Sequence, residues 1–202
     1  MSSTNPSRWE QIVQANPDHS TWYIERFRQM AQQGKDLDGE ARMIDAMLPR
    51  GSRILDAGCG PGRVGGSLAR RGHTVVGVDV DPTLIAAAEA DHPEVTWLVG
   101  DISELDLPDR GISEPFDAIV MAGNVMTFLA EGSEAQTLAR LREHLAASGR
   151  LVVGFGAGRG YALDDYAAHV REAGLREDLR LGTWDLRPFG PESDFLVSIL
   201  TR

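Results

Sequence analysis

The chain has 202 residues, of which 25% are charged, and its formal net charge is −10. This length suits one domain with a full hydrophobic core, and the acidic balance argues against a nucleic-acid partner, whose phosphates need a basic surface. Cys59 is the single cysteine, so no intramolecular disulfide can form. The sequence has neither a signal-peptide pattern nor an apolar run long enough to span a membrane, so we expect a cytoplasmic protein without a membrane partner.

Residues 1–50 predict a set of amphipathic helices that form an N-terminal cap. Apolar side chains recur there at helical spacing, as in Trp22, Phe27 and Met30. The glycine-containing stretch 34–40 is either a hinge, because glycines absorb backbone rotation, or an ordinary connection between helices. We place the core of the domain at residues 51–202.

This second part of the chain alternates between apolar strands and helices. The strands are expected at residues 53–56, 74–79, 95–99, 117–121, 150–155, 175–186 and 195–201. The helices are expected at residues 62–71, 82–91, 133–147 and 164–173. Asp81 is the expected N-cap of the second of these helices, with Pro82 at its first position. Residues 103–115 are expected to form a polar loop.

Strands that alternate with helices predict an α/β fold, a doubly wound and mostly parallel sheet of seven strands with helices on both faces. The last two strands are joined through residues 188–191, which are too few for a helical crossover. We therefore expect the last strand to run antiparallel to the one before it. Near that edge, Trp184, Phe189 and Phe195 are either core side chains or the contact of a homodimer.

A glycine-rich turn follows the first strand. Gly58, Gly60 and Gly62 carry no Cβ, so the backbone can turn tightly there and approach a ligand closely. Asp79 ends the second strand, where a carboxylate can accept hydrogen bonds from both hydroxyls of a ribose. Together, the two features predict a site for a nucleoside-containing cofactor at the carboxyl ends of the strands.

Several segments resemble, in order, the motifs of the class I S-adenosylmethionine (SAM)-dependent methyltransferases. Residues 56–62 read Asp-Ala-Gly-Cys-Gly-Pro-Gly and resemble the first motif of that family, and Asp79 follows at the family's spacing. Residues 98–102, Leu-Val-Gly-Asp-Ile, are similar to the end of its third strand, and residues 116–120, Phe-Asp-Ala-Ile-Val, to its fourth. The resemblance runs from about Arg53 to the C-terminus and implies the Rossmann-like methyltransferase fold.

The resemblance implies that SAM is the cofactor and S-adenosylhomocysteine (SAH) the product. It also implies that the three glycines pass under the aminoacyl part of SAM, that Asp79 holds the ribose, and that Asp101 and Ile102 hold the adenine. Asp56 either touches the cofactor or holds the turn through backbone amides. The expected cofactor-binding residues are Asp56, Ala57, Gly58, Gly60, Gly62, Asp79, Val80, Gly100, Asp101, Ile102, Ala122, Tyr23 and Arg26.

The acceptor is expected beyond the fourth strand, at segment 121–128, which faces the methyl group in the family. Asn124 there either hydrogen-bonds an acceptor or the cofactor, or caps the next helix. It is not followed by two prolines and an aromatic residue, which departs from the family's adenine and glutamine-amide methyltransferases. The acidic composition and the absence of a large substrate domain favour a small-molecule acceptor that is methylated on nitrogen or oxygen.

The N-terminal helix around residue 20 mixes aromatic and basic side chains. His19, Tyr23 and Arg26 lie on one face of this helix. That face either closes over the cofactor as a lid, with Tyr23 or an arginine meeting the SAM carboxylate, or belongs to an ordinary surface helix. The candidates for a catalytic role are His19, Tyr23 and Asn124.

Two other functions stay open at this stage. Residues 60–65 also match Gly-x-Gly-x-x-Gly, the dinucleotide fingerprint, which would make the chain an NAD-dependent oxidoreductase. A cofactor site that turns over no acceptor would instead belong to a non-catalytic SAM-binding protein. No metal site is predicted.

Overall fold

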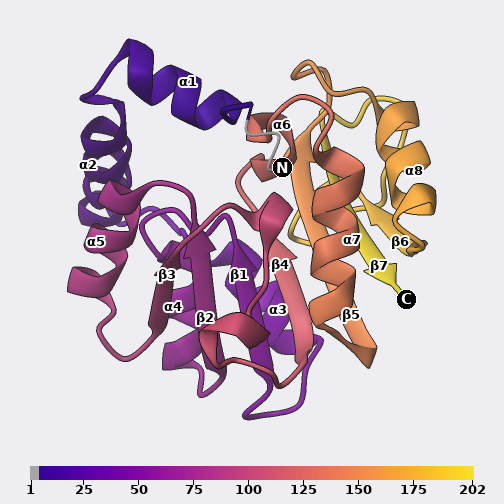
Figure 1. Ribbon diagram of the computed structural model, residues 1–202, viewed down its shortest axis with the longest axis horizontal. Coiled ribbons are helices and arrows are strands. Elements are labelled where there is room, and N and C mark those ends of the chain that lie inside the picture. The colour runs from indigo at the N-terminus through magenta and orange to yellow at the C-terminus, as the bar shows by residue number, and fades with distance from the viewer. Residues whose placement is uncertain (1–4) are drawn as a thin grey trace.

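The computed structural model describes residues 5–202, within which seven strands form one sheet in the order β3-β2-β1-β4-β5-β7-β6 (Figure 1). The strands are β1 (Arg53–Ala57), β2 (Thr74–Asp79), β3 (Thr96–Val99), β4 (Phe116–Met121), β5 (Leu145–Gly156), β6 (Arg176–Leu181) and β7 (Phe195–Thr201). β1 to β5 pair in parallel, and β7 runs antiparallel to both β5 and β6. The expected fold class, with its antiparallel last strand, is confirmed.

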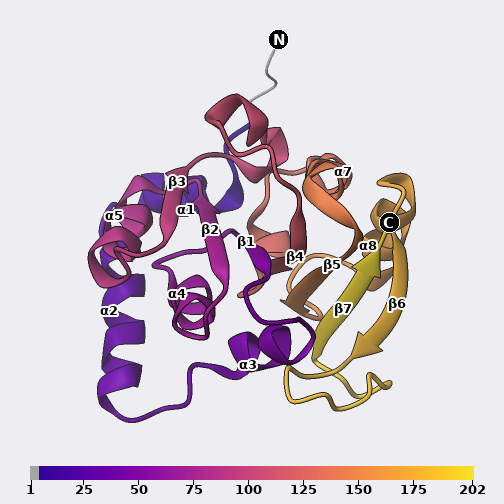
Figure 2. The ribbon, with the colours of Figure 1, turned by 90° about the horizontal axis from the view of Figure 1, so that it is seen from below.

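Helices cover both faces of the sheet, as parallel strands require (Figure 2). The helices are α1 (Arg8–Ala15), α2 (His19–Gln32), α3 (Gly39–Ala46), α4 (Arg63–Arg70), α5 (Pro82–Asp91), α6 (Val125–Phe128), α7 (Glu134–His144) and α8 (Leu163–Glu172), with 3-10 turns η1 (Ile102–Glu104) and η2 (Pro108–Arg110). Side chains of α3, α4 and α5 pack on one face, for example Ile44 and Leu68. Side chains of α7 and α8 pack on the other, for example Leu138 and Tyr166.

The strand order reverses between β1 and β4, so the loops after these strands diverge and leave a crevice at their carboxyl ends. This edge of the sheet is where the sequence places the cofactor site. Gly77 of β2 lets the Trp97 ring lie against the sheet, since a Cβ at position 77 would lie 2.2 Å from that ring. Gly154 of β5 accommodates the ring of Trp184 in the same way.

Trp184 and Phe195 pack together with ring centroids 6.5 Å apart and lie against the core, and Phe189 also packs on the core. Their contacts agree with the core role that the sequence left open for them.

Two expected boundaries were wrong. The helix predicted to reach residue 147 ends at His144, because Leu145 is buried and its backbone already pairs with Phe116 of β4. The strand predicted for residues 175–186 ends at Leu181, because the backbone N–H of Gly182 bonds the carbonyl of Arg187 and closes a turn. The first end is decided by a strand pairing distant in sequence, and the second by a local turn.

Two loops that the sequence left without helices contain short ones. The expected polar loop 103–115 carries the turn η2 and begins within η1, and segment 121–128 contains α6. Each of these helices is only one turn long, so neither leaves a periodic pattern in the sequence.

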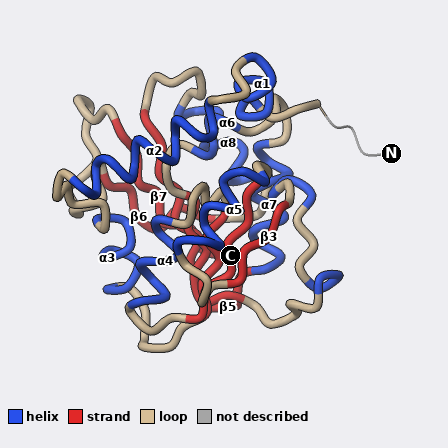
Figure 3. The backbone as a smooth tube through the Cα atoms, turned by 90° about the vertical axis from the view of Figure 1, so that its left-hand side faces the viewer, coloured by secondary structure: helices blue, strands red, loops and turns tan. Residues whose placement is uncertain are grey.

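The first three helices do not occupy one place in the fold. α3 packs against α4 on a face of the sheet, whereas α1 and α2 lie toward the carboxyl ends of the strands and α2 runs past α5 (Figure 3). Only α1 and α2 are therefore placed to act as a cap over the strand ends. The division of the chain into a cap of residues 1–50 and a core stays a prediction.

Asp81 fastens α1 and α2 to the rest of the protein. Its Oδ1 accepts the backbone N–H of Thr83 and so caps α5, as expected. Its Oδ2 accepts the indole N–H of Trp9 at 2.9 Å and the hydroxyl of Ser20. Burial alone would raise the pKa of Asp81, but the hydrogen bonds from Ser20, from Trp9 and from the backbone at the start of α5 together outweigh it and lower the pKa. One buried carboxylate thus joins three helices.

No helix within residues 5–202 is both long enough and apolar enough to cross a membrane.

We predict that Asp81→Ala lowers the free energy of unfolding by about 2–4 kcal/mol, because the buried donors of Trp9 and Ser20 lose their partner and α5 loses its cap. Urea unfolding measures this change. Asp18 is the matched control: it occupies the N-cap position of α2, is exposed and makes no capping bond through its side chain. Asp18→Ala should change the free energy by less than about 0.5 kcal/mol. Equal effects of the two substitutions would contradict the anchoring role of Asp81.

Candidate functional site

A cavity that is partly open to solvent lies at the carboxyl ends of β1, β2, β3 and β4. The lining consists of Ser7, Trp9, Tyr23, Phe27, Asp56, Gly58, Cys59, Gly60, Pro61, Arg63, Val64, Asp79, Val80, Leu84, Gly100, Asp101, Ile102, Ala122, Gly123, Val125, Phe128, Leu129 and Ala130. The cavity therefore brings together the turn after β1, the strand-end acids, and residues of α1, α2 and α6.

The three glycines of the turn have positive φ angles, and they serve different purposes. A Cβ at Gly58 would lie 2.5 Å from a methyl group of Val125, and one at Gly62 would lie 2.9 Å from Ala88 and the Trp97 ring. Both positions are thus needed for packing. A Cβ at Gly60 would meet only the Tyr23 ring, at 3.8 Å. Gly60 and Gly58 line the cavity, and Gly62 does not.

Asp79 holds the turn in place. One carboxylate oxygen accepts the backbone N–H of Gly60 at 2.8 Å, and the other accepts that of Asp81 at 3.0 Å. The side chain is buried, and this burial raises the pKa of Asp79 to about 6 despite the two hydrogen bonds. Each oxygen retains further acceptor capacity toward the cavity that it lines.

Asp56 lies at the base of the cavity and also serves the turn. Its Oδ2 accepts the backbone N–H of Gly65 in the first turn of α4 at 2.8 Å. Burial raises the pKa of Asp56 to about 7, because few groups around it stabilise the charged form. The sequence left open whether Asp56 holds the turn or touches a ligand, and the structure gives it the hydrogen bond for the first and a cavity-lining position for the second.

The remaining expected cofactor residues are spread along the same edge. Asp101 caps η1 by accepting the N–H of Ser103 at 2.8 Å, and Gly100 donates to the carbonyl of Asp79. The residues that line the cavity at this end are Val80, Gly100, Asp101, Ile102 and Ala122. Ala57 is fully buried in the sheet and does not line it.

Of the three residues expected on one face of α2, only Tyr23 lines the cavity. Burial raises the pKa of Tyr23, so its hydroxyl stays protonated at neutral pH. His19 packs its ring against Trp9 and Trp22, and Arg26 lies over the rings of Trp22 and Phe27. These contacts direct His19 and Arg26 along the helix surface instead of into the cavity.

Asn124 also lies outside the cavity lining. It occupies the N-cap position of α6 with a positive φ of 68°, yet its side chain makes no capping bond. Its Oδ1 accepts the backbone N–H of Gly156 at 2.7 Å instead. The side chain therefore links the loop after β4 to the end of β5.

Several lining residues were missed from the sequence, above all Trp9, Phe27, Arg63 and Phe128. Phe27 and Phe128 lie in the expected lid helix and the expected acceptor segment, but no motif there singles out either ring as a site residue. Arg63 directly follows the glycine turn at the start of α4, a position that could have suggested it. Trp9 offers no local signal, because its partner Asp81 lies 72 residues away.

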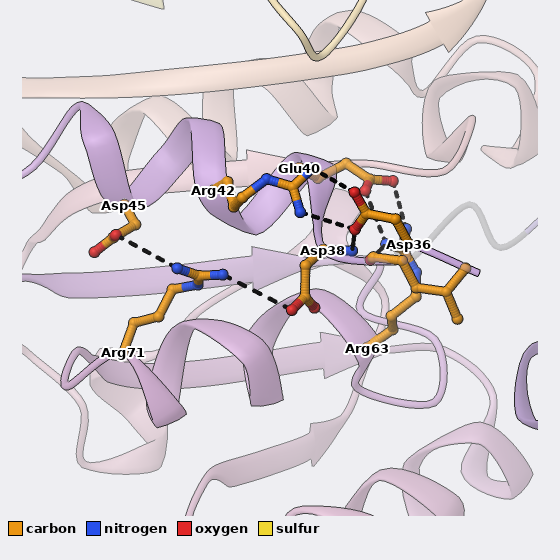
Figure 4. Close-up of polar contacts among 8 residues, drawn as sticks. Asp36, Asp38, Glu40, Arg42, Asp45, Arg63 and Arg71 are labelled. Atoms are coloured by element: carbon orange, nitrogen blue, oxygen red, sulfur yellow. Dashed lines mark hydrogen bonds and ion pairs between the residues drawn. The ribbon is translucent and has the colours of Figure 1, made fainter. Parts of the chain in front are cut away.

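Arg63 is held by the segment between α2 and α3 and by the first turn of α3 (Figure 4). Glu40 accepts two hydrogen bonds from its guanidinium, at 2.5 and 2.8 Å, and the carbonyl of Leu37 accepts another. Burial alone would lower the pKa of Arg63, but the bonds to Glu40 outweigh it and raise the pKa. Neighbouring ion pairs fix the same segment, through Arg42 with Asp36 and Arg71 with Asp38 and Asp45.

Two comparisons identify the family. The family described as "Methyltransferase domain" matches residues 54–149. The crystal structure of a TehB-like SAM-dependent methyltransferase from Corynebacterium glutamicum is 50% identical to this chain, covers 93% of it and 100% of its own chain, and has a TM-score of 0.87. The chain belongs to the class I SAM-dependent methyltransferases. SAM is the cofactor of this family.

Curated relatives match shorter parts of the methyltransferase. A methyltransferase of Mycobacterium tuberculosis (strain ATCC 25618 / H37Rv) is 40% identical over 82 residues, which are 39% of either chain. The magnesium-protoporphyrin O-methyltransferase of Rhodobacter capsulatus is 37% identical over 118 residues, 53% of this chain and 48% of its own. The chain thus spans less than half the length of these relatives. Because the family is shown, the nicotinamide-dependent alternative finds no support.

The cavity suits the chemistry of this cofactor. Asp79 and Asp101 present carboxylate oxygens, which can accept from hydroxyl and amino groups. Val80, Leu84 and Ile102 present apolar surface that a flat base can contact. Among residues 5–202, no three His, Cys, Asp or Glu side chains are arranged to hold a metal ion.

The raised pKa of Asp56 predicts an unusual pH dependence of stability. Its pKa rises from 3.8 in the unfolded chain to about 7 in the folded protein. The folded state therefore holds the proton more tightly, and the stabilisation it provides below pH 4 is lost as the pH rises toward 7. Between about pH 5 and 7 the stability advantage of the wild type over Asp56→Asn should fall by roughly 2 kcal/mol.

Urea unfolding of both proteins across this pH range measures the change. Asp36 is the control, because it is exposed and its ion pair with Arg42 lowers its pKa to about 2. Asp36 is then ionised in both states throughout the range, and Asp36→Asn should leave the slope unchanged. If Asp56→Asn also leaves the dependence of the unfolding free energy on pH unchanged, Asp56 is already ionised at pH 5 in the folded protein.

Proposed function

We propose that this methyltransferase transfers the methyl group of SAM to a nitrogen or oxygen atom of a small-molecule acceptor. The observation that carries the proposal is one cavity in which strand-end acids and the glycine turn meet aromatic side chains from α1, α2 and α6. The name of the Rhodobacter relative indicates transfer to oxygen in that protein. Both acceptor atoms therefore stay within the general proposal.

SAM supplies an activated methyl group on a positively charged sulfur. The protein therefore has to bind SAM and the acceptor, orient them for transfer, and exclude water. In our proposal Asp79 accepts hydrogen bonds from the ribose hydroxyls, because its buried carboxylate lies directly beside the glycine turn. Asp101 and Ile102 hold the adenine, by a hydrogen bond and by apolar contact. Gly60 leaves room for the aminoacyl part, since no side chain other than Tyr23 approaches its Cβ position.

Arg63 is our proposed partner for the carboxylate of SAM. Its bonds to Glu40 and Leu37 use the two terminal nitrogens, and its Nε–H has no partner among the described residues. The guanidinium lies against the Phe27 ring, with its Cζ 5.4 Å from the ring centroid, which fixes its plane. A guanidinium held in this way can bind a carboxylate with little further loss of side-chain freedom.

The first test is calorimetric titration with SAH. We expect Asp79→Asn to weaken SAH binding at least about tenfold, because charge-assisted hydrogen bonds to a ribose would be lost. Asp117→Asn is the control, since Asp117 binds the backbone of Arg53 at the opposite edge of the sheet. Wild-type protein that bound neither SAM nor SAH would overturn the proposed function. If neither substitution weakened SAH binding, only the proposed role of Asp79 in holding the ribose would be overturned.

A second titration tests Arg63 by comparing SAH with methylthioadenosine, which lacks the amino-acid part. Arg63→Met keeps an apolar stem against Phe27 and should weaken SAH binding about tenfold while leaving methylthioadenosine binding nearly unchanged. Arg70→Met, on the last turn of the same helix, should change neither. An equal loss for both ligands would show that Arg63 acts only by supporting the fold.

A further inference from the structure

Four aromatic side chains form a continuous row along the cavity lining. Phe128, Trp9, Tyr23 and Phe27 all line the cavity, and successive ring centroids are 5.7, 5.3 and 5.0 Å apart. Each pair meets edge to face, an arrangement that aromatic rings prefer. The rings come from α6, α1 and α2, so this aromatic row is held by three elements. It offers a ligand a surface of aromatic rings that are already packed against one another.

The polar groups of Trp9 and of the neighbouring Ser7 already make hydrogen bonds within the protein, whereas that of Tyr23 does not. The indole N–H of Trp9 donates to Asp81, and the hydroxyl of Ser7 donates to Glu10. The hydroxyl of Tyr23 has no hydrogen-bond partner among the described residues and stays protonated. A ligand on the aromatic row therefore meets apolar rings and one neutral hydroxyl.

The charges of the cavity disfavour an anion. Asp56, Asp79 and Asp101 line it, and burial raises the pKa of the first two, which shows that negative charge is costly there. Arg63 is the single basic side chain in the described lining, and it is paired with Glu40. In the proposed function its remaining N–H donors are given to the carboxylate of SAM. No basic side chain of the described lining is then left for a negatively charged acceptor.

We propose that the acceptor is a flat, uncharged aromatic molecule that binds at the Phe128 and Trp9 end of the aromatic row and is methylated on nitrogen, and that anionic acceptors are excluded. The other end of the row, Tyr23 and Phe27, faces the aminoacyl part and the carboxylate of SAM in the proposed function. This inference rests on the proposed function and narrows it. The occupant follows from charge complementarity, because a neutral ring that becomes a cation suits a lining of carboxylates and aromatic faces.

The chemistry balances without a base. The lone pair of the acceptor nitrogen forms the new N–C bond while the C–S bond breaks, and the electrons of that bond stay on sulfur. The positive charge passes from sulfur to nitrogen, so the total charge in the cavity is constant. A ring nitrogen keeps this charge, and an amine releases a proton to water afterwards. A phenol would have to lose its proton for efficient attack, and the two lining acids with raised pKa values, Asp56 and Asp79, are engaged by α4 and by the glycine turn and the ribose in the proposed function.

Quinoline and quinaldate test the inference, because they share one ring system and differ by a carboxylate. Each is titrated into protein saturated with SAH, and binding is measured by calorimetry. We expect quinoline to bind at least about tenfold more tightly. Quinaldate binding as tightly as quinoline, or neither compound binding at millimolar concentrations, would overturn the inference.

A charge variant tests the cause of the preference. Ala130 lines the cavity and is half-buried, so Ala130→Lys adds a cation to the lining and Ala130→Met adds similar length without charge. The lysine variant should lose most of the preference for quinoline, and the methionine variant should keep it. A preference that persists in the lysine variant would contradict the electrostatic explanation.

SAH affinity is measured on every variant, because it separates the proposed function, SAM-dependent methyl transfer, from the proposed class of acceptor. A protein that does not bind SAH refutes the proposed function. A protein that binds SAH but prefers the anion refutes only the acceptor class.

Discussion

Two acids at the end of β2 hold the strand edge together. Asp79 binds the backbone of Gly60 through one oxygen and that of Asp81 through the other. The side chain of Asp81 then continues the connection to Trp9 and Ser20. The glycine turn, the start of α5 and the first two helices are thus linked by one chain of hydrogen bonds. The shape of the cavity depends on this chain, because the glycine turn, α1 and α2, which supply part of its lining, are attached to it.

The cavity also carries an electrostatic cost in the absence of ligand. Asp56 and Asp79 are buried, and the pKa of each is raised because water no longer solvates the charge. A ligand with net positive charge relieves that cost, and its binding energy then includes the stabilisation of these carboxylates. The same groups that make the empty site less stable therefore favour a sulfonium-bearing cofactor over its neutral product.

Local patterns in the sequence were sufficient for the order of strands and helices, the glycine turn and the position of Asp79, because each depends on neighbours along the chain. The end of α7 was missed, because the pairing of Leu145 with Phe116 overrides the helix propensity of the alanines that follow. Trp9 was missed because its burial depends on Asp81. The packing role of Gly62 likewise depends on Trp97, which no local pattern reveals.

The anchoring of the first helices has a consequence for the order in which the protein forms. Trp9 and Ser20 find their partner 72 and 61 residues further along the chain. During synthesis, which proceeds from the N-terminus, α1 and α2 therefore emerge well before the carboxylate that holds them. They can dock only after β2 and the start of α5 exist. The helices that are made first therefore take their place in the cavity wall only after a later part of the chain has formed.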